Sequence, residues 1–177
     1  MSPSSMPPTF RAFVGMGGNL GDVFARLRSA VAGLGQLPWT EVEAVSGVYQ
    51  TRPVDADGPD YLNAVVALRS SLGPQELLRA LLSLECEHDR TRPYWHAPRT
   101  LDLDLLWYGG VRLDTPTLTL PHPRMLDRAF VLEPLCDLIQ NQGCLWPHDL
   151  PQPSAARRAE LAALQGISKM ESISLTK

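Results

Sequence analysis

The side chains best suited to chemistry are two carboxylates inside an apolar stretch, PRTLDLDLLWYGG, at residues 98–110. Asp102 and Asp104 alternate with leucines there. Successive side chains of a β-strand point to opposite faces, so the two carboxylates share one face and the leucines share the other. Carboxylates this close repel each other unless positive charge lies nearby. Mg²⁺ fits, because it binds one or two carboxylates together with substrate phosphates, and two such ions can flank a phosphoryl group.

Arginines surround this pair in the sequence. Arg90, Arg92 and Arg99 precede it and Arg128 follows it, whereas both lysines of the chain lie in its last nine residues. A guanidinium group offers a planar set of donors that suits phosphate oxygens. The pattern favours a metal–triphosphate site. Two alternatives stay open: a codon bias toward arginine, and ion pairs between the aspartates and arginines on a solvent-facing sheet.

Regular elements must position these groups. Apolar alternation predicts strands at 10–16, 40–51 and 61–69, besides the strand that contains the aspartates. Apolar residues at helical spacing predict helices at about 20–37 and 74–88, with Pro74 in the first turn of the second helix. The resulting order, βαββαββα when the later elements are included, predicts an α+β fold in which helices cover a face of one sheet.

The remaining segments read mostly as loops. Residues 52–60 and 89–99 are rich in Pro and charge, and 120–125 is a turn. A short strand at 111–114 is expected to form a hairpin with the aspartate strand across Gly109-Gly110. Helices are expected at 127–139 and 155–165. We therefore expect a disordered tail at 1–9, one domain at 10–165 and a polar C-terminal tail at 166–177.

Composition excludes several classes of protein. A chain of 177 residues, 44% hydrophobic and 20% charged, is typical of a single globular domain. The net charge of −3 argues against nucleic-acid binding, and there is no apolar run long enough to span a membrane. Three cysteines without a CxxC pair and the lack of a signal peptide predict a cytoplasmic protein without disulfides. No obligatory protein partner is indicated.

Four separated motifs, in order, resemble a known enzyme family. These are GMGGNLGD, VYQTRPVDADGPDYLNAVVAL, PRTLDLDLL and LPHPRMLDRAFVLEPL, within residues 11–147. Together they are similar to 6-hydroxymethyl-7,8-dihydropterin pyrophosphokinase of folate biosynthesis. The resemblance implies a ferredoxin-like α+β sandwich with one mainly antiparallel sheet. It implies transfer of the β,γ-pyrophosphoryl group of ATP to the pterin hydroxymethyl oxygen, with release of AMP.

The resemblance also implies roles for individual residues. Asp102 and Asp104 would hold two Mg²⁺ ions, and catalysis would depend on them and on Arg90, Arg92 and Arg99. The ATP-binding residues implied by the family are Arg90, Arg92, Arg99, Leu105, Thr119, His122 and Arg128. The pterin-binding residues implied by the family are Thr51, Val54, Tyr61, Asn63, His96 and Phe130, and the family often has Trp where His96 falls.

The strand pattern supports part of the pterin set independently. Tyr61 and Asn63 alternate onto one face, opposite Leu62 and Ala64. An asparagine amide offers a donor and an acceptor side by side, as the amino-oxo edge of a pterin requires. Phe130 could stack on the flat ring. Taken singly, Phe130 or Tyr61 would more often be a plain core residue, whereas an amide inside an apolar strand needs polar partners.

The expected chemistry is positioning and charge neutralisation, as in phosphoryl transfer generally, without a named general base. The loops at 52–60 and 89–99 are expected to close over bound substrates and exclude water. Two alternative interpretations of the aspartate pair stay open. One is a nucleotidyl- or glycosyltransferase whose aspartate pair also binds a metal ion, and the other is a non-catalytic domain that binds a flat heterocycle. The released nucleotide distinguishes the transferases from the pyrophosphokinase, and ATP binding without Mg²⁺ dependence would indicate the non-catalytic domain.

Overall fold

A computed structural model describes residues 7–53, 58–88, 100–170 and 174–176 of the chain. One six-stranded sheet, in which every pairing is antiparallel, has the order β5-β1-β4-β3-β8, and β2 also pairs with β4. The sheet strands are β1 (Phe10–Gly18), β2 (Thr40–Val45), β3 (Tyr49–Thr51), β4 (Tyr61–Ser70), β5 (Asp102–Tyr108) and β8 (Ile167–Lys169). The predicted α+β architecture is confirmed.

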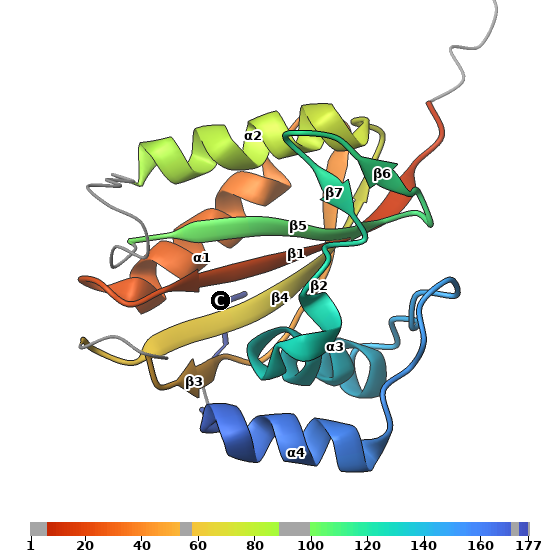
Figure 1. Cartoon of the computed structure of the whole chain (residues 1–177). Helices are drawn as coiled ribbons and strands as arrows, with labels where there is room; N and C mark the ends of the chain where they lie inside the picture. Colours follow the sequence, from red (N-terminus) through yellow and green to blue (C-terminus); the bar gives the residue numbers. More distant parts are fainter. Residues whose placement is uncertain (1–6, 54–57, 89–99, 171–173, 177) are drawn as a thin grey trace, which may run out of the picture.

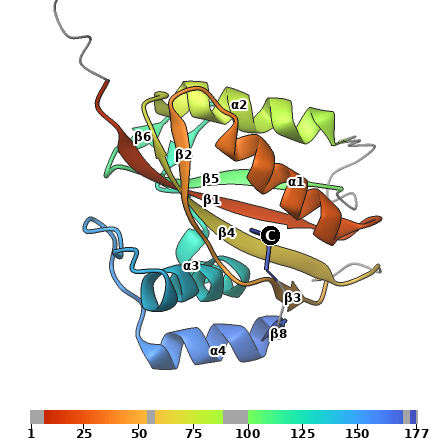
Figure 2. The same cartoon turned by 180° about the vertical axis from the view of Figure 1, so that it is seen from behind.

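Helices cover both faces of this sheet, and not a single face as the order of elements suggested. Figures 1 and 2 show α1 (Val23–Gly35) and α2 (Pro74–Glu87) on one face, and α3 (Ala129–Asn141) on the other with α4 (Ala155–Gln165) beyond it. Two separate apolar clusters result, because alternate residues of each strand face opposite layers. On β1, for example, Val14 belongs to the cluster under α1 and α2, while Phe13 belongs to the cluster under α3.

The predicted helices form where apolar residues recur on one side. In α1 the buried residues are Val23, Leu27, Ala30, Val31 and Leu34, and the Asp22 side chain caps the helix by accepting from the Ala25 N–H. Pro74 occupies the first turn of α2, as expected. The helix at 155–165 is confirmed as α4, with Ser154 as its N-cap. None of the helices in the described segments is both long and apolar enough to cross a membrane.

The strand predicted at 40–51 is divided into β2 and β3. The Ser46 hydroxyl accepts from the Val65 N–H at 2.9 Å, so a side chain takes the place of a strand carbonyl at this point. The Gly47 N–H then donates to Asp137 of α3 rather than to β4. Two short strands therefore follow one another along the same edge of β4.

The predicted hairpin between β5 and residues 111–114 is wrong. β6 (Leu113–Asp114) instead pairs with β7 (Thr119–Leu120) in a separate two-stranded sheet. The outer edge of β5 is already used, because Leu106 accepts from the His122 N–H at 2.8 Å and Leu103 donates to Glu85 of α2 at 2.7 Å. Gly109 and Gly110, both at positive φ, turn the chain away from the sheet.

Two shorter differences concern the later part of the chain. The helix predicted at 127–139 begins two residues later as α3, and a single 3₁₀ turn, η1 (Met125–Asp127), precedes it. Within the segment expected to be a polar tail, Ile167–Lys169 forms β8 on the edge of β3. Leu175 is buried in the cluster under α1 and α2. The sequence did not predict this strand or this packing.

Candidate active site

A pocket lies on the α3 face of the sheet, where three strands and one helix meet. It has about 300 Å³ of empty space, counting the part open to solvent. Its lining residues are Gly15, Met16 and Gly17 of β1, Asn63 and Ala64 of β4, Asp102, Asp104 and Leu106 of β5, and Phe130 and Val131 of α3.

Two glycines of β1 make the floor of this pocket. Gly15 pairs with Asp104 and Gly17 with Asp102 on one side, and Gly17 pairs with Asn63 on the other. These positions alternate with Met16, which is buried in the opposite core. The central strand therefore has no side chain between the carboxylates and the amide, which leaves a flat strip of backbone.

The two aspartates lie on one face of β5, as the alternation predicted. Leu103 and Leu105, between and after them, are buried in the cluster under α1 and α2. The side chain of Asp104 is 42% exposed, and its Oδ2 lies 3.8 Å from the Arg128 guanidinium. Both carboxylates thus face the pocket from a strand whose other face is anchored in the core.

Asn63 is 6% exposed and is held by a specific polar contact. Its Nδ2 donates to Thr51 Oγ1 at 3.0 Å, which fixes the orientation of the amide. Its Oδ1 lies over the floor, because a Cβ added to Gly17 would come within 2.8 Å of that oxygen. The structure therefore brings together Asn63 and Thr51, two residues of the expected pterin set, and Gly17 is required for the amide to fit.

Phe130 and Arg128 come from the start of α3. The Arg128 guanidinium carbon lies 5.3 Å from the centroid of the Phe130 ring, and the same side chain reaches toward Asp104. Arg128 thereby links the aromatic wall of the pocket to the carboxylates. Its side chain is 20% exposed, so a ligand in the pocket could still reach it.

His122 lies beside β5, where its backbone N–H donates to the Leu106 carbonyl. Its Nδ1 accepts from the Arg124 N–H at 3.2 Å. Burial first, and then the positive charges of Arg128 and Arg124, lower the pKa of His122 to about 4, while Asp102 acts in the opposite direction. At neutral pH the ring is therefore uncharged, with its proton on Nε2, from which it can donate.

Other predicted residues lie apart from the pocket or outside the described structure. Thr119 is on β7, with its hydroxyl 3.4 Å from Asp114. Leu105 has its side chain in the opposite core, so only its backbone is available to a nucleotide. Tyr61 begins β4 next to Thr51, in the same alternation as Asn63. The predicted residues outside the described ranges are Val54, Arg90, Arg92, His96 and Arg99.

Sequence reasoning missed the floor of the pocket and one support of β5. Glycines at alternate positions of a strand, Gly15 and Gly17, were the available signal, since an interior strand glycine often marks a close approach. Glu85, 1% exposed on α2, accepts from the Leu103 N–H between the two aspartates. A carboxylate among leucines in a helix was the corresponding signal.

The donor set suits Mg²⁺ better than a metal held by protein alone. Within the described ranges, no group of three or more His, Cys, Asp or Glu side chains gathers where it could hold a metal ion. Two carboxylates beside an open pocket match an ion that keeps water and takes phosphate oxygens as further ligands.

Comparison with known proteins decides the family. The sequence model of the 7,8-dihydro-6-hydroxymethylpterin-pyrophosphokinase (HPPK) family matches residues 13–140. This range includes the glycine floor of the pocket, both aspartates and Phe130. The chain belongs to the HPPK family.

Two curated relatives match over most of their length. A 2-amino-4-hydroxy-6-hydroxymethyldihydropteridine pyrophosphokinase from Synechocystis sp. is 45% identical over 139 residues, covering 78% of this chain and 71% of the relative. The enzyme of the same name from Pseudomonas aeruginosa is 39% identical over 164 residues, covering 90% of this chain and 96% of the relative.

Solved structures support the HPPK fold. The wild-type Plasmodium falciparum HPPK-DHPS with pteroate superposes with a TM-score of 0.65 at 12% identity, over 91% of this chain. The match covers 44% of that longer chain. At 12% sequence identity this structural similarity is evidence for the fold alone, and the fold agrees with the expected ferredoxin-like sandwich.

Proposed function

We propose that this protein transfers the β,γ-pyrophosphoryl group of ATP to the hydroxymethyl oxygen of 6-hydroxymethyl-7,8-dihydropterin and releases AMP. One observation carries the proposal: a single pocket joins two carboxylates, a fixed amide and an aromatic ring, from β5, β4 and α3. The membership of the HPPK family and the names of its relatives agree with this reaction.

The pterin ring would lie on the glycine floor, between Asn63 and Phe130. Because the Nδ2 of Asn63 donates a hydrogen bond to Thr51, its Oδ1 is the atom that accepts a hydrogen bond from the amino edge of the pterin. Phe130 would stack on the ring. Tyr61, Val54 and His96 complete the proposed pterin set.

The triphosphate would lie across the aspartate edge. Asp102 and Asp104 would hold Mg²⁺, two ions in our proposal, which would neutralise phosphate charge. Arg128, next to Asp104, stabilises charge on the group being transferred. His122 donates from neutral Nε2 to a phosphate oxygen, and Thr119, Arg90, Arg92, Arg99 and the backbone of Leu105 complete the proposed nucleotide set.

The test is a product assay. Protein, ATP, Mg²⁺ and hydroxymethyl-dihydropterin are mixed, and the nucleotides are separated by chromatography. AMP that appears only with pterin supports the proposal. Release of pyrophosphate or of a nucleoside diphosphate would point to a nucleotidyl- or glycosyltransferase, and no turnover with Mg²⁺-independent ATP binding would point to a non-catalytic domain.

The aspartates provide the first prediction from this function. Asp102→Ala and Asp104→Ala should each lower kcat by about 100-fold or more, because each removes a ligand to the metal that offsets phosphate charge. Both variants should keep the circular dichroism spectrum of the wild type. Glu41→Gln, at an exposed position of β2, is the matched control. Turnover at the wild-type rate from either aspartate variant would contradict the metal assignment.

A further inference from the structure

The start of α3 carries two groups of the proposed site, yet it has no capping side chain of its own. Arg128 is the N-cap residue, and its side chain makes no capping hydrogen bond. The first N–H groups of a helix have no partner within the helix and need one elsewhere. Ala129, which provides the first of them, is 1% exposed, so solvent cannot satisfy it.

Gln165, at the end of α4, supplies that partner from 36 residues away. Its Oε1 accepts from the Ala129 N–H at 2.8 Å, and its Nε2 donates to the Asp127 carbonyl at 2.9 Å. A single planar amide thus binds the backbone on both sides of Arg128. Phe130 directly follows Ala129, whose N–H makes one of these two hydrogen bonds.

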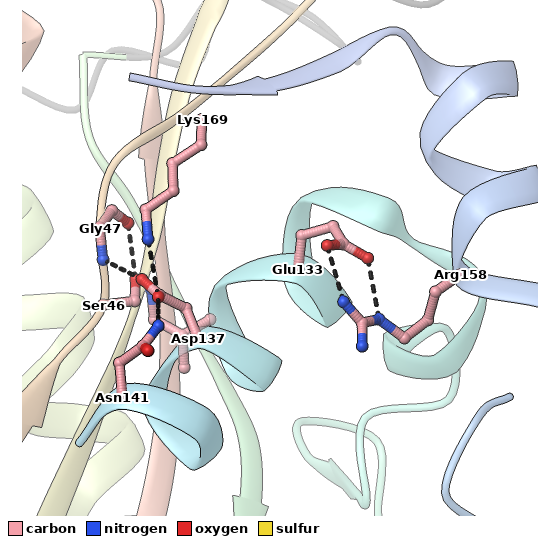
Figure 3. A network of polar contacts seen from close by, with 8 residues as sticks. Ser46, Gly47, Glu133, Asp137, Asn141, Arg158 and Lys169 are labelled. Carbon is pink, nitrogen blue, oxygen red and sulfur yellow. Dashed lines mark hydrogen bonds and ion pairs between the residues drawn. The ribbon is translucent and has the colours of Figure 1, made fainter. Parts of the chain in front are cut away.

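The segment that contains Gln165 is attached to α3 by ion pairs on both sides of this residue. Figure 3 shows Arg158 of α4 paired with Glu133 of α3, through contacts of 3.0 and 2.9 Å. It also shows Lys169 of β8 reaching Asp137 of α3, at 2.7 Å. Between these anchors, Gly166 ends α4 in the left-handed conformation and the chain enters β8.

We propose that Gln165 is a positioning residue that sets Arg128 and Phe130 in the pocket, and that this is a task of the α4–β8 segment. The inference rests on the proposed function. It concerns residues beyond 13–140, the range that matches the family model. Gln165 is not among the residues that line the pocket, and its two hydrogen bonds go to the backbone of Asp127 and Ala129.

The rival explanation is that Gln165 only helps to dock α4. The Arg158–Glu133 pair separates the two explanations, because it joins the same two helices but lies away from the start of α3. Gln165→Met keeps the length of the side chain and removes both hydrogen bonds. Arg158→Met keeps the aliphatic stem and removes the ion pair, which makes it the matched control.

Four quantities are measured on the full chain: the free energy of unfolding in urea, hydrogen exchange of the peptide that contains Ala129, the kcat with ATP, and the Kd for pterin in the presence of a non-hydrolysable ATP analogue. For Gln165→Met we expect faster exchange at Ala129 and a pterin Kd raised roughly 5- to 30-fold, from the loss of two hydrogen bonds. For Arg158→Met we expect lower stability, but exchange at Ala129 and a Kd within twofold of wild type.

Gln165→Glu keeps the acceptor for the Ala129 N–H and loses the donor to Asp127, so its Kd should fall between those of wild type and Gln165→Met. It also serves if Gln165→Met does not fold. Wild-type Kd and kcat in the Gln165 variants, or equal losses in Gln165→Met and Arg158→Met, would overturn the inference while the wild type stays active. A wild type that makes no pterin-dependent AMP would overturn the proposed function as well.

Discussion

At the scale of single residues, the pocket depends on the absence of a side chain. Gly17 has no Cβ, and a Cβ there would lie 2.8 Å from Asn63 Oδ1. That distance is shorter than any normal contact, so the amide and the added methyl group cannot both keep their places. The shape of the proposed pterin site therefore depends on a glycine as much as on the amide itself.

Gly17→Ala should displace Asn63, break its hydrogen bond to Thr51 and weaken pterin binding by about tenfold or more, since a buried amide would lose its orientation. The Kd from pterin fluorescence measures this. Gly35→Ala is the control, because a Cβ there would meet Val42 at an ordinary 3.7 Å. An unchanged Kd for Gly17→Ala would show that Asn63 does not bind the pterin.

His122 gives a prediction about pH. Burial and two nearby arginines lower the pKa of His122 from 6.5 to about 4. Between these values the unfolded chain binds a proton that the folded chain does not, so stability should fall as pH drops from 6.5 to 4, by at most about 3 kcal/mol.

Urea midpoints at several pH values test this, with His122→Asn as the comparison. Asparagine keeps an acceptor near the position of Nδ1 but does not titrate. The difference in unfolding free energy between wild type and variant should change over this pH window. A difference that stays constant from pH 4 to 7 would contradict the lowered pKa.

At the scale of elements, the attachment of β8 to α3 depends on the buried carboxylate of Asp137. Asp137 of α3 is 7% exposed and accepts from Lys169, Gly47 and Asn141. Burial raises the pKa of Asp137, but these donors, the Lys169 ammonium first among them, outweigh it and lower the pKa overall. The carboxylate thus joins α3, β8 and the link between β2 and β3.

Lys169→Met should destabilise the fold by about 1–3 kcal/mol at pH 7, because it leaves the Asp137 charge without its cationic partner. Asp137 contributes stability above its unfolded pKa and loses it as pH falls through its lower folded pKa, so the penalty should shrink below about pH 4. Urea unfolding at pH 7 and pH 3.5 measures it. Arg157→Gln, which breaks an exposed pair with Glu160, should leave the midpoint unchanged. Equal penalties at both pH values would contradict a charged Asp137.

At the scale of the whole molecule, the sheet separates two apolar cores, and its middle strands are enclosed by both. β1 lies between β5 and β4, and β4 lies between β1 and the pair β2 and β3. β8 is an edge strand of three residues, and two of these are exposed. The centre of the sheet should therefore open only when the whole domain unfolds.

Hydrogen exchange followed by mass spectrometry tests whether the centre of the sheet opens later than β8. Amides of β1 and β4 should exchange slowest, at the rate of global unfolding, and those of β8 faster through local opening. The reason is that the central strands are hydrogen-bonded along both edges and buried under helices. Equal protection of β8 and β1 would mean that the C-terminal strand unfolds only with the core.

The sequence alone determined the features that depend on local periodicity. The side-chain alternation of a strand and the spacing of apolar residues in a helix are properties of the chain itself, so α1, α4 and the shared face of Asp102 and Asp104 could be predicted. The motifs around Asn63 and Phe130 identified the family.

The tertiary structure alone decided which edges and ends meet. A short strand can pair with any free edge, so the choice of β7 rather than β5 for residues 113–114 depended on His122 already occupying that edge. A helix end accepts any suitable partner, so nothing near Arg128 in sequence pointed to Gln165. Such contacts join residues far apart in the chain, and only packing brings them within hydrogen-bonding distance.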